Sequence, residues 1–160
     1  MPDSPAKASH LQYQAQETSL TLREGLKEYA DANPNLIDTA TTSTESVGVY
    51  LNNHDVSHVV FGTTTELRDE AMQDMWTFLA IDIPAKQYVR NFLQEEEGKQ
   101  VMTSLPVGGS IMAFFWMLGK LPQLMWRSWR MPKKWLWKGW ESYLDVPLAE
   151  IRREFRIRVL

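Results

Sequence analysis

Apolar residues recur at helical spacing in several segments of the chain, and no long segment alternates between apolar and polar residues. Leu22, Leu26 and Tyr29 fall on one face of a short amphipathic segment, which ends at the sequence NPN, residues 33–35. A last helix is expected to begin at Pro147 and to continue through the sequence LAEIRREF. Because no strand pattern competes, the sequence predicts an all-α fold.

The longest amphipathic pattern contains two of the histidines. Its apolar-face positions are Val47, Tyr50, Leu51, His54, His58 and Phe61. Thr42 and Glu45 fit a capping box that opens this helix, and Gly62 is a natural helix stop. Thr63 and Glu66 fit a second capping box, so the next helix must turn back on the first. The sequence therefore predicts an antiparallel helix hairpin with both histidines on its buried face.

Two further helices are expected between the hairpin and the C-terminal region. Pro84 favours the start of a helix over about residues 84–97, and the sequence MTSLPVGGS, residues 102–110, is typical of a loop. An apolar helix should follow from there and break near Pro122. The apolar run at 107–119 is shorter than the roughly 18 to 20 residues that span a bilayer, so it predicts a core or interfacial helix.

Length and composition indicate one domain. The chain has 160 residues, of which 44% are hydrophobic, and this is enough for a core of its own. Residues 1–19 are predicted to be disordered and residues 20–160 to form a single helical domain. The first residues lack the apolar run of a secretory signal, which favours an intracellular location. Without cysteine, a metal site must use His, Asp or Glu.

Charge is distributed unevenly along the chain. Residues 1–97 carry sixteen acids and six bases, a net charge of −10, whereas residues 98–160 carry four acids and eleven bases, a net charge of +7. Residues 116–140 contain six of the seven tryptophans together with six Lys or Arg, and no acid lies between Glu97 and Glu141. This tryptophan-rich basic segment needs an explanation of its own.

Two interpretations of the segment stay open. The tryptophans can form part of the core while Lys and Arg extend outward to solvent, or they can lie at a membrane interface beside anionic headgroups. Binding of nucleic acid is not expected, because the chain has no recognition motif and is acidic overall. The candidate lipid-contacting residues are Trp116, Trp126, Trp129, Arg130, Trp135 and Trp137.

Four residues in the hairpin are of types that bind metals. His54 and His58 are one helical turn apart, and a returning helix would bring Glu70 to the level between them. Asp55 can join only from the edge, as a ligand or as a partner that orients an imidazole. Core histidines satisfied by hydrogen bonds are the alternative. The expected metal is Zn²⁺, while Fe²⁺, Mn²⁺ and Mg²⁺ stay alternatives.

The motif resembles the signature of the coenzyme Q biosynthesis protein family of the fourth ("Coq-four") type. That signature is His-Asp-x-x-His, eleven residues and Glu, and it is matched here by His54, Asp55, His58 and Glu70. A second similarity lies at residues 143–157, where the sequence YLDVPLAEIRREFRI resembles the closing Pro-Leu-x-Glu-x-Arg segment of the family.

The resemblance covers residues 45–157 in patches, with departures. Asp69 stands where members of the family usually have glycine, and residues 50–53 stand where they have arginines. The chain is also shorter at its N-terminus than the family pattern. These differences favour a divergent member of the family.

The resemblance implies a helical protein of ubiquinone, or prenylquinone, biosynthesis. The four motif residues would bind the metal and act in catalysis, and the protein would lie peripherally on the cytoplasmic or mitochondrial inner membrane. The expected activity is that of a metal-dependent decarboxylase, a lyase that removes the ring carboxylate of a polyprenyl hydroxybenzoate. The alternatives are a non-catalytic isoprenoid-lipid-binding scaffold and a metal-dependent prenyl-phosphate hydrolase. Expected partners are a polyprenyl lipid or quinone precursor, other quinone biosynthesis proteins and a second copy in a homodimer.

Overall fold

A computed structural model describes residues 10–34, 45–94 and 107–159 of the chain. The described residues form helices without a strand, which confirms the predicted all-α class. The α-helices are α1 (Leu22–Ala32), α2 (Glu45–Phe61), α3 (Leu67–Ala80), α4 (Ala85–Gln94), α6 (Val107–Trp129) and α7 (Leu148–Phe155). The short 3-10 helices are η1 (Gln12–Gln14) and η2 (Trp140–Tyr143). The last helix begins after Pro147, as predicted.

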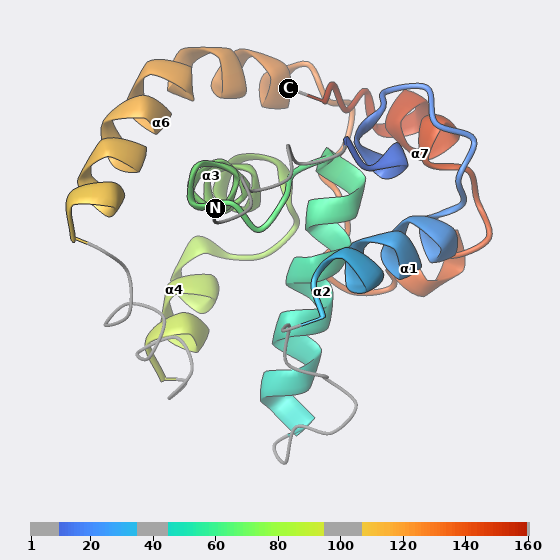
Figure 1. Cartoon of the computed structure of the whole chain (residues 1–160), viewed down its shortest axis with the longest axis horizontal. Helices are drawn as coiled ribbons and strands as arrows, with labels where there is room; N and C mark the ends of the chain where they lie inside the picture. Colours follow the sequence, from blue (N-terminus) through green and yellow to red (C-terminus); the bar gives the residue numbers. More distant parts are fainter. Residues whose placement is uncertain (1–9, 35–44, 95–106, 160) are drawn as a thin grey trace, which may run out of the picture.

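Helices α2 and α3 are the two central helices of the fold. Figure 1 shows α6 curving around α3 on one side of the molecule, while α1 and α7 lie on the other side of α2. In this view α2 runs in the plane of the picture and α3 is seen nearly end-on. Residues 62–66 join these two consecutive helices, and their antiparallel pairing stays a prediction. The core between the helices includes Phe61, Trp76, Trp135 and Phe155.

The N-terminal segment is part of this core. Residues 10–19, which the sequence predicts to be disordered, pack against α1 and α2, while residues 1–9 lie outside the described residues. Tyr13 is fully buried, and its backbone N–H donates to the carboxylate of Glu28 at 2.9 Å. Arg152 holds the carbonyl groups of Tyr13 and Ala15 from the far end of the chain. These contacts join residues distant in sequence, so no local pattern could reveal them.

The predicted Thr63–Glu66 capping box is wrong. Glu66 is the N-cap residue of α3, and no side chain caps the helix there. Thr63 is instead buried, with its hydroxyl bonded to His58. The carboxylate of Asp69 accepts hydrogen bonds from the N–H and the hydroxyl of Thr64. Thr42, of the other predicted capping box, lies outside the described residues.

The predicted break at Pro122 is also wrong, because α6 continues through it. The proline removes one backbone donor, which leaves the carbonyl of Leu118 without its usual helical partner. Pro122 and Leu118 are both exposed, so water can bond that carbonyl. Figure 1 shows that α6 is curved. No helix among the described residues is both long and apolar enough to span a membrane.

Gly62 ends α2 in a left-handed conformation with a φ of 74°. The N–H of Thr63 donates to the carbonyl of His58 at 3.0 Å, which is the six-to-one bond of a Schellman motif. A β-carbon at position 62 would lie 2.6 Å from Cγ1 of Val159. Glycine is therefore required at this turn by its backbone and by its neighbour.

Gly62→Ala should lower the free energy of unfolding by more than the roughly 1–2 kcal/mol that a left-handed alanine costs, since Val159 must also move. Gly139→Ala is the matched control, because Gly139 has a φ of 83° with nothing within 4 Å of the added β-carbon. Urea unfolding of both variants measures the difference. Equal losses of stability would show that the contact with Val159 costs nothing.

Candidate metal centre

Two helices supply the cluster that the sequence singles out. His54 and His58 lie one turn apart on α2, and Glu70 comes from the first turn of α3. One ligand atom of each residue lies within 4.8 Å of the others. The imidazole rings of the histidines have centroids 4.7 Å apart, and Nε2 of His58 lies 3.5 Å from Oε2 of Glu70. The structure thus brings together three of the four predicted ligands.

His58 is the most buried member of the cluster, with none of its surface exposed. Its Nδ1 lies 2.9 Å from Oγ1 of Thr63, and that hydroxyl donates to Oε1 of Gln73 at 2.9 Å. Its Nε2 is buried and has no hydrogen-bond partner. The Glu70 carboxylate lies 3.5 Å from it, and a ligand bound on that side of the ring would replace the hydrogen bond to water that the atom loses on burial.

Aromatic residues support the His58 ring. Tyr29 of α1 stacks on it, with ring centroids 5.6 Å apart, and Tyr13 packs edge-on against Tyr29. The hydroxyl of Tyr13 donates to the carbonyl of Thr63 at 2.9 Å. Packing and hydrogen bonds therefore fix the position of the imidazole and of the threonine that bonds it.

The protonation states of the cluster suit a cation. Burial, followed by the neighbouring His58, lowers the pKa of His54 to about 4, so this imidazole is neutral at physiological pH. Burial raises the pKa of Glu70, but the two histidines outweigh it and the pKa lies below its usual value. A neutral imidazole and an ionised carboxylate are the forms that bind metals.

The donor set also fits a divalent transition metal in number and spacing. Two histidines and one carboxylate are the protein ligands of many catalytic zinc and non-haem iron sites, which keep positions open for water or substrate. Donors about 2.0–2.2 Å from a metal stand at most about 4.4 Å apart, close to the 4.8 Å spread of the cluster. Side-chain rotations that bring the donor atoms closer would allow His54, His58 and Glu70 to hold one ion.

Asp55, the fourth predicted ligand, is not part of the cluster. Its Oδ1 accepts a long hydrogen bond of 3.4 Å from the hydroxyl of Tyr29. Burial raises the pKa of Asp55 to about 6. The predicted four-ligand set is thus reduced to three, because Asp55 points from the neighbouring face of α2 toward Tyr29.

Two residues that were not predicted from the sequence, Gln73 and Asp74, lie near the metal cluster. Asp74 lies one turn after Glu70 and accepts a hydrogen bond of 2.7 Å from the hydroxyl of Tyr88 on α4. Burial raises the pKa of Asp74 to about 6. Gln73 and Asp74 stand three and four residues after Glu70, and this helical spacing was the signal that could have identified them.

The tryptophan-rich segment divides into a buried and an exposed part. Trp135 and Trp137 are buried in the core, so their predicted contact with lipid is corrected to a structural role. Trp116 is half-buried on α6. Trp126 and Trp129 are 53% and 85% exposed, and Arg130 is exposed beside them. Sequence alone could not separate the two groups, since both interpretations use the same residue types.

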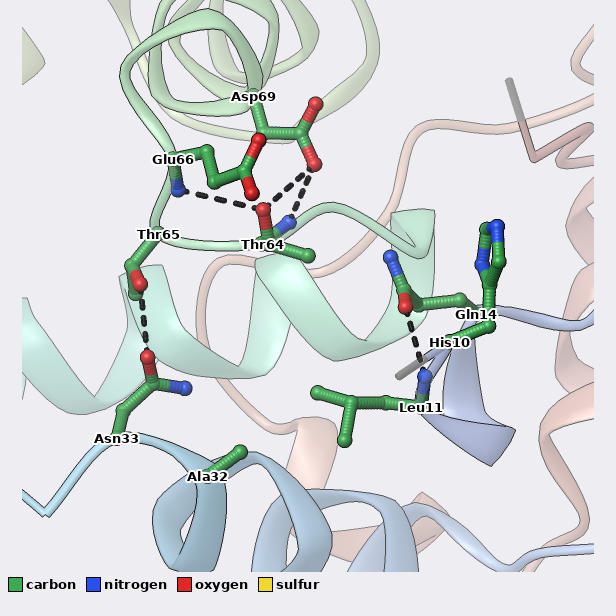
Figure 2. A pocket seen from close by; sticks show the side chains of 9 residues that line it. All are labelled: His10, Leu11, Gln14, Ala32, Asn33, Thr64, Thr65, Glu66 and Asp69. Atoms are coloured by element: carbon green, nitrogen blue, oxygen red, sulfur yellow. Dashed lines mark hydrogen bonds between the residues drawn. The ribbon is translucent and has the colours of Figure 1, made fainter. Parts of the chain in front are cut away.

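A pocket of about 490 Å³ lies at the connection between α2 and α3 (Figure 2). Of its two acidic residues, Asp69 accepts a hydrogen bond from the hydroxyl of Thr64; Thr65 donates to Oδ1 of Asn33 at 2.7 Å. None of the three candidate metal ligands lines it. Its lining residues are His10, Leu11, Gln14, Ala32, Asn33, Thr64, Thr65, Glu66 and Asp69.

Comparisons with protein-family models, with curated proteins and with solved structures find no match to the chain.

Proposed function

We propose that the chain binds one divalent metal through His54, His58 and Glu70 and removes the ring carboxylate of a polyprenylated hydroxybenzoate at a membrane surface. The metal site is inferred chiefly from Nε2 of His58. This atom is buried, lacks a hydrogen-bond partner and lies 3.5 Å from the Glu70 carboxylate. The substrate class rests on the similarity of the His-Asp-x-x-His and Glu spacing, and of the closing segment, to the Coq-four family.

The reaction makes limited demands on the protein. The carboxylate leaves as CO₂, and a proton takes its place on the ring carbon. A bound metal would supply a Lewis acid for the carboxylate or phenolate oxygen of the substrate. His54, His58 and Glu70 would hold it, and Asp55, whose carboxyl is partly buried beside the cluster, or a water would deliver the proton.

Turnover by the purified protein tests the enzyme. A prenylated 4-hydroxybenzoate in lipid vesicles is supplied to metal-loaded protein, to chelated protein and to Glu70→Gln. We expect one CO₂ per product in the loaded protein alone, without consumption of O₂. Uptake of O₂ would indicate an oxidative reaction, and phosphate release from a prenyl phosphate would favour the hydrolase. No turnover with Zn²⁺, Fe²⁺ or Mn²⁺ would contradict the enzymatic role.

A lipid-binding scaffold for quinone biosynthesis is the second candidate, and the outer face of α6 favours it. Large apolar side chains are exposed there in a sequence region without acids. The guanidinium of Arg130 lies over the ring of Trp126 at 4.7 Å from its centroid, so a positive charge that could attract anionic lipid stands beside an exposed tryptophan. The exposed residues are Phe115, Leu118, Met125, Trp126 and Trp129.

Replacing Trp126 and Trp129 together by serine should weaken binding to anionic vesicles by about tenfold or more. Burial of a large apolar side chain contributes about 1.5–3 kcal/mol, and 1.4 kcal/mol corresponds to tenfold in affinity. Sedimentation with vesicles measures the effect. Val89→Ser on α4 is the control, because Val89 is an exposed apolar residue on another helix. If the double variant binds vesicles as tightly as the wild type, α6 does not form the membrane contact.

A further inference from the structure

Thr63 is bonded to its surroundings through its backbone and its side chain. Its N–H donates to the carbonyl of His58, its carbonyl accepts from the hydroxyl of Tyr13, and its own hydroxyl lies between Nδ1 of His58 and Oε1 of Gln73. Thr63 and Gln73 are both fully or almost fully buried, so water does not compete for these bonds. The hydroxyl is therefore a fixed link between the His58 ring and α3.

The direction of the link determines where the ring carries its proton. A hydroxyl has one hydrogen, and that of Thr63 is donated to Gln73 when the amide presents Oε1 to it, an orientation in which Nε2 of Gln73 is buried without a hydrogen-bond partner. Toward His58 the hydroxyl can then only accept, so the hydrogen bond at 2.9 Å requires the proton on Nδ1. The lone pair of Nε2 consequently faces Glu70, on the side where Nε2 has no hydrogen-bond partner.

We propose that Thr63 and Gln73 are positioning residues that hold the His58 imidazole in the tautomer with its proton on Nδ1, and so prepare Nε2 to bind a metal. That this tautomer serves to bind a metal rests on the proposed function. Without the link, the Glu70 carboxylate 3.5 Å away would attract the proton to Nε2 and block it as a ligand. Partners of this kind contribute about 10- to 100-fold to metal affinity at other sites.

The tautomer is measured first, without metal. Nitrogen-15 NMR at about pH 8, where imidazoles are ordinarily neutral, distinguishes the two forms, and the chain has only three histidines to assign. The wild type should carry the proton of His58 on Nδ1, and Thr63→Ser should keep it there. In Gln73→Met the hydroxyl is released to donate to Nδ1, and in Thr63→Val it is absent. Both variants should shift the proton to Nε2.

Affinity for Zn²⁺ is then measured by competition with a chelator. Thr63→Val and Gln73→Met should bind about 10- to 100-fold more weakly than the wild type, and Thr63→Ser should bind within a few-fold of it. The control is Thr77→Val, because Thr77 is also buried on α3 but its hydroxyl donates to a backbone carbonyl of its own helix. If Thr63→Val does not fold, the tautomer and the Zn²⁺ affinity of Gln73→Met test the proposal instead.

Two results would overturn the proposal. One is a wild-type His58 with its proton on Nε2, which would mean that the Gln73 amide is turned round and donates to Thr63. The other is a Gln73→Met variant with unchanged tautomer and unchanged affinity. If the wild type binds no Zn²⁺, Fe²⁺ or Mn²⁺, the proposed function fails, and the metal-free spectra alone support or overturn the role of Thr63 and Gln73.

Discussion

Replacing Arg152 by methionine is expected to lower the free energy of unfolding by about 3–5 kcal/mol, because several buried carbonyls lose their charged donor and each unsatisfied group costs about 1–3 kcal/mol. Arg152 is fully buried, and burial lowers the pKa of its guanidinium to about 10, so the group is still charged at neutral pH. It donates to the carbonyls of Val59 and Val60 in the last turn of α2, and to Tyr13 and Ala15. Methionine fills similar space but leaves these carbonyls without their donor.

Thermal unfolding followed by circular dichroism measures the effect of Arg152→Met. For a chain of this size, 1 kcal/mol corresponds to about 2–4 °C, so Tm should fall by about 6–20 °C. Arg153→Met is the matched control on the same helix, because Arg153 is exposed and its Nε bonds only a carbonyl one turn before it. It should change stability by less than about 0.5 kcal/mol. Equal small effects of the two substitutions would contradict the role given to Arg152.

The second large effect is expected at the metal ligands. Glu70→Gln should weaken metal binding by more than about 100-fold, since even outer partners of metal ligands contribute 10- to 100-fold. With metal at 100 times its Kd, the wild type should gain about 2.7 kcal/mol of stability, or about 5–11 °C in Tm. The variant should gain almost nothing at the same metal concentration.

Glu66→Gln is the control for this substitution. Glu66 lies one turn before Glu70, is exposed and is not part of the metal cluster. Its replacement removes the same charge near the same helix end, so a general effect of charge would appear in both variants. Equal metal-induced shifts in the wild type, Glu66→Gln and Glu70→Gln would place the metal elsewhere on the chain.

The sequence was sufficient for the helical class and for the three clustered ligands. Helical spacing placed His54 and His58 on one face, and the glycine at position 62 indicated the turn that returns Glu70 to them. The same spacing could not decide the place of Asp55, because an edge position on a helix can face the site or a neighbouring helix. Only the packing of Tyr29 from α1 shows which neighbour Asp55 meets.

Long-range contacts explain most of what the sequence did not reveal. The order of residues 10–19 depends on Arg152, which lies almost the whole chain away. Thr63 looked like a helix cap, but its hydroxyl is bonded to a histidine and a glutamine in the core. Trp135 resembles its exposed neighbours in sequence, yet its backbone pairs with that of Ala80 and its ring lies in the core.

The contacts of Arg152 also explain the structural role of the closing segment, residues 143–157. Its arginine, Arg152, donates to the carbonyl of Val60, two residues after His58 on α2, and to that of Tyr13 in the N-terminal segment. We infer that this arginine helps to hold α2 in the position where His58 meets Glu70. Loss of metal binding in Arg152→Met should therefore accompany its loss of stability.

Metal content of the purified protein tests the central claim most directly. The chain is prepared without an affinity metal, and plasma mass spectrometry compares the wild type with a His54→Ala/His58→Ala double variant. About one equivalent of a transition metal is expected in the wild type and none in the variant. Absence of metal from the wild type, even after addition of Zn²⁺, Fe²⁺ and Mn²⁺, would contradict the claim and leave the two histidines as polar residues of a helix face.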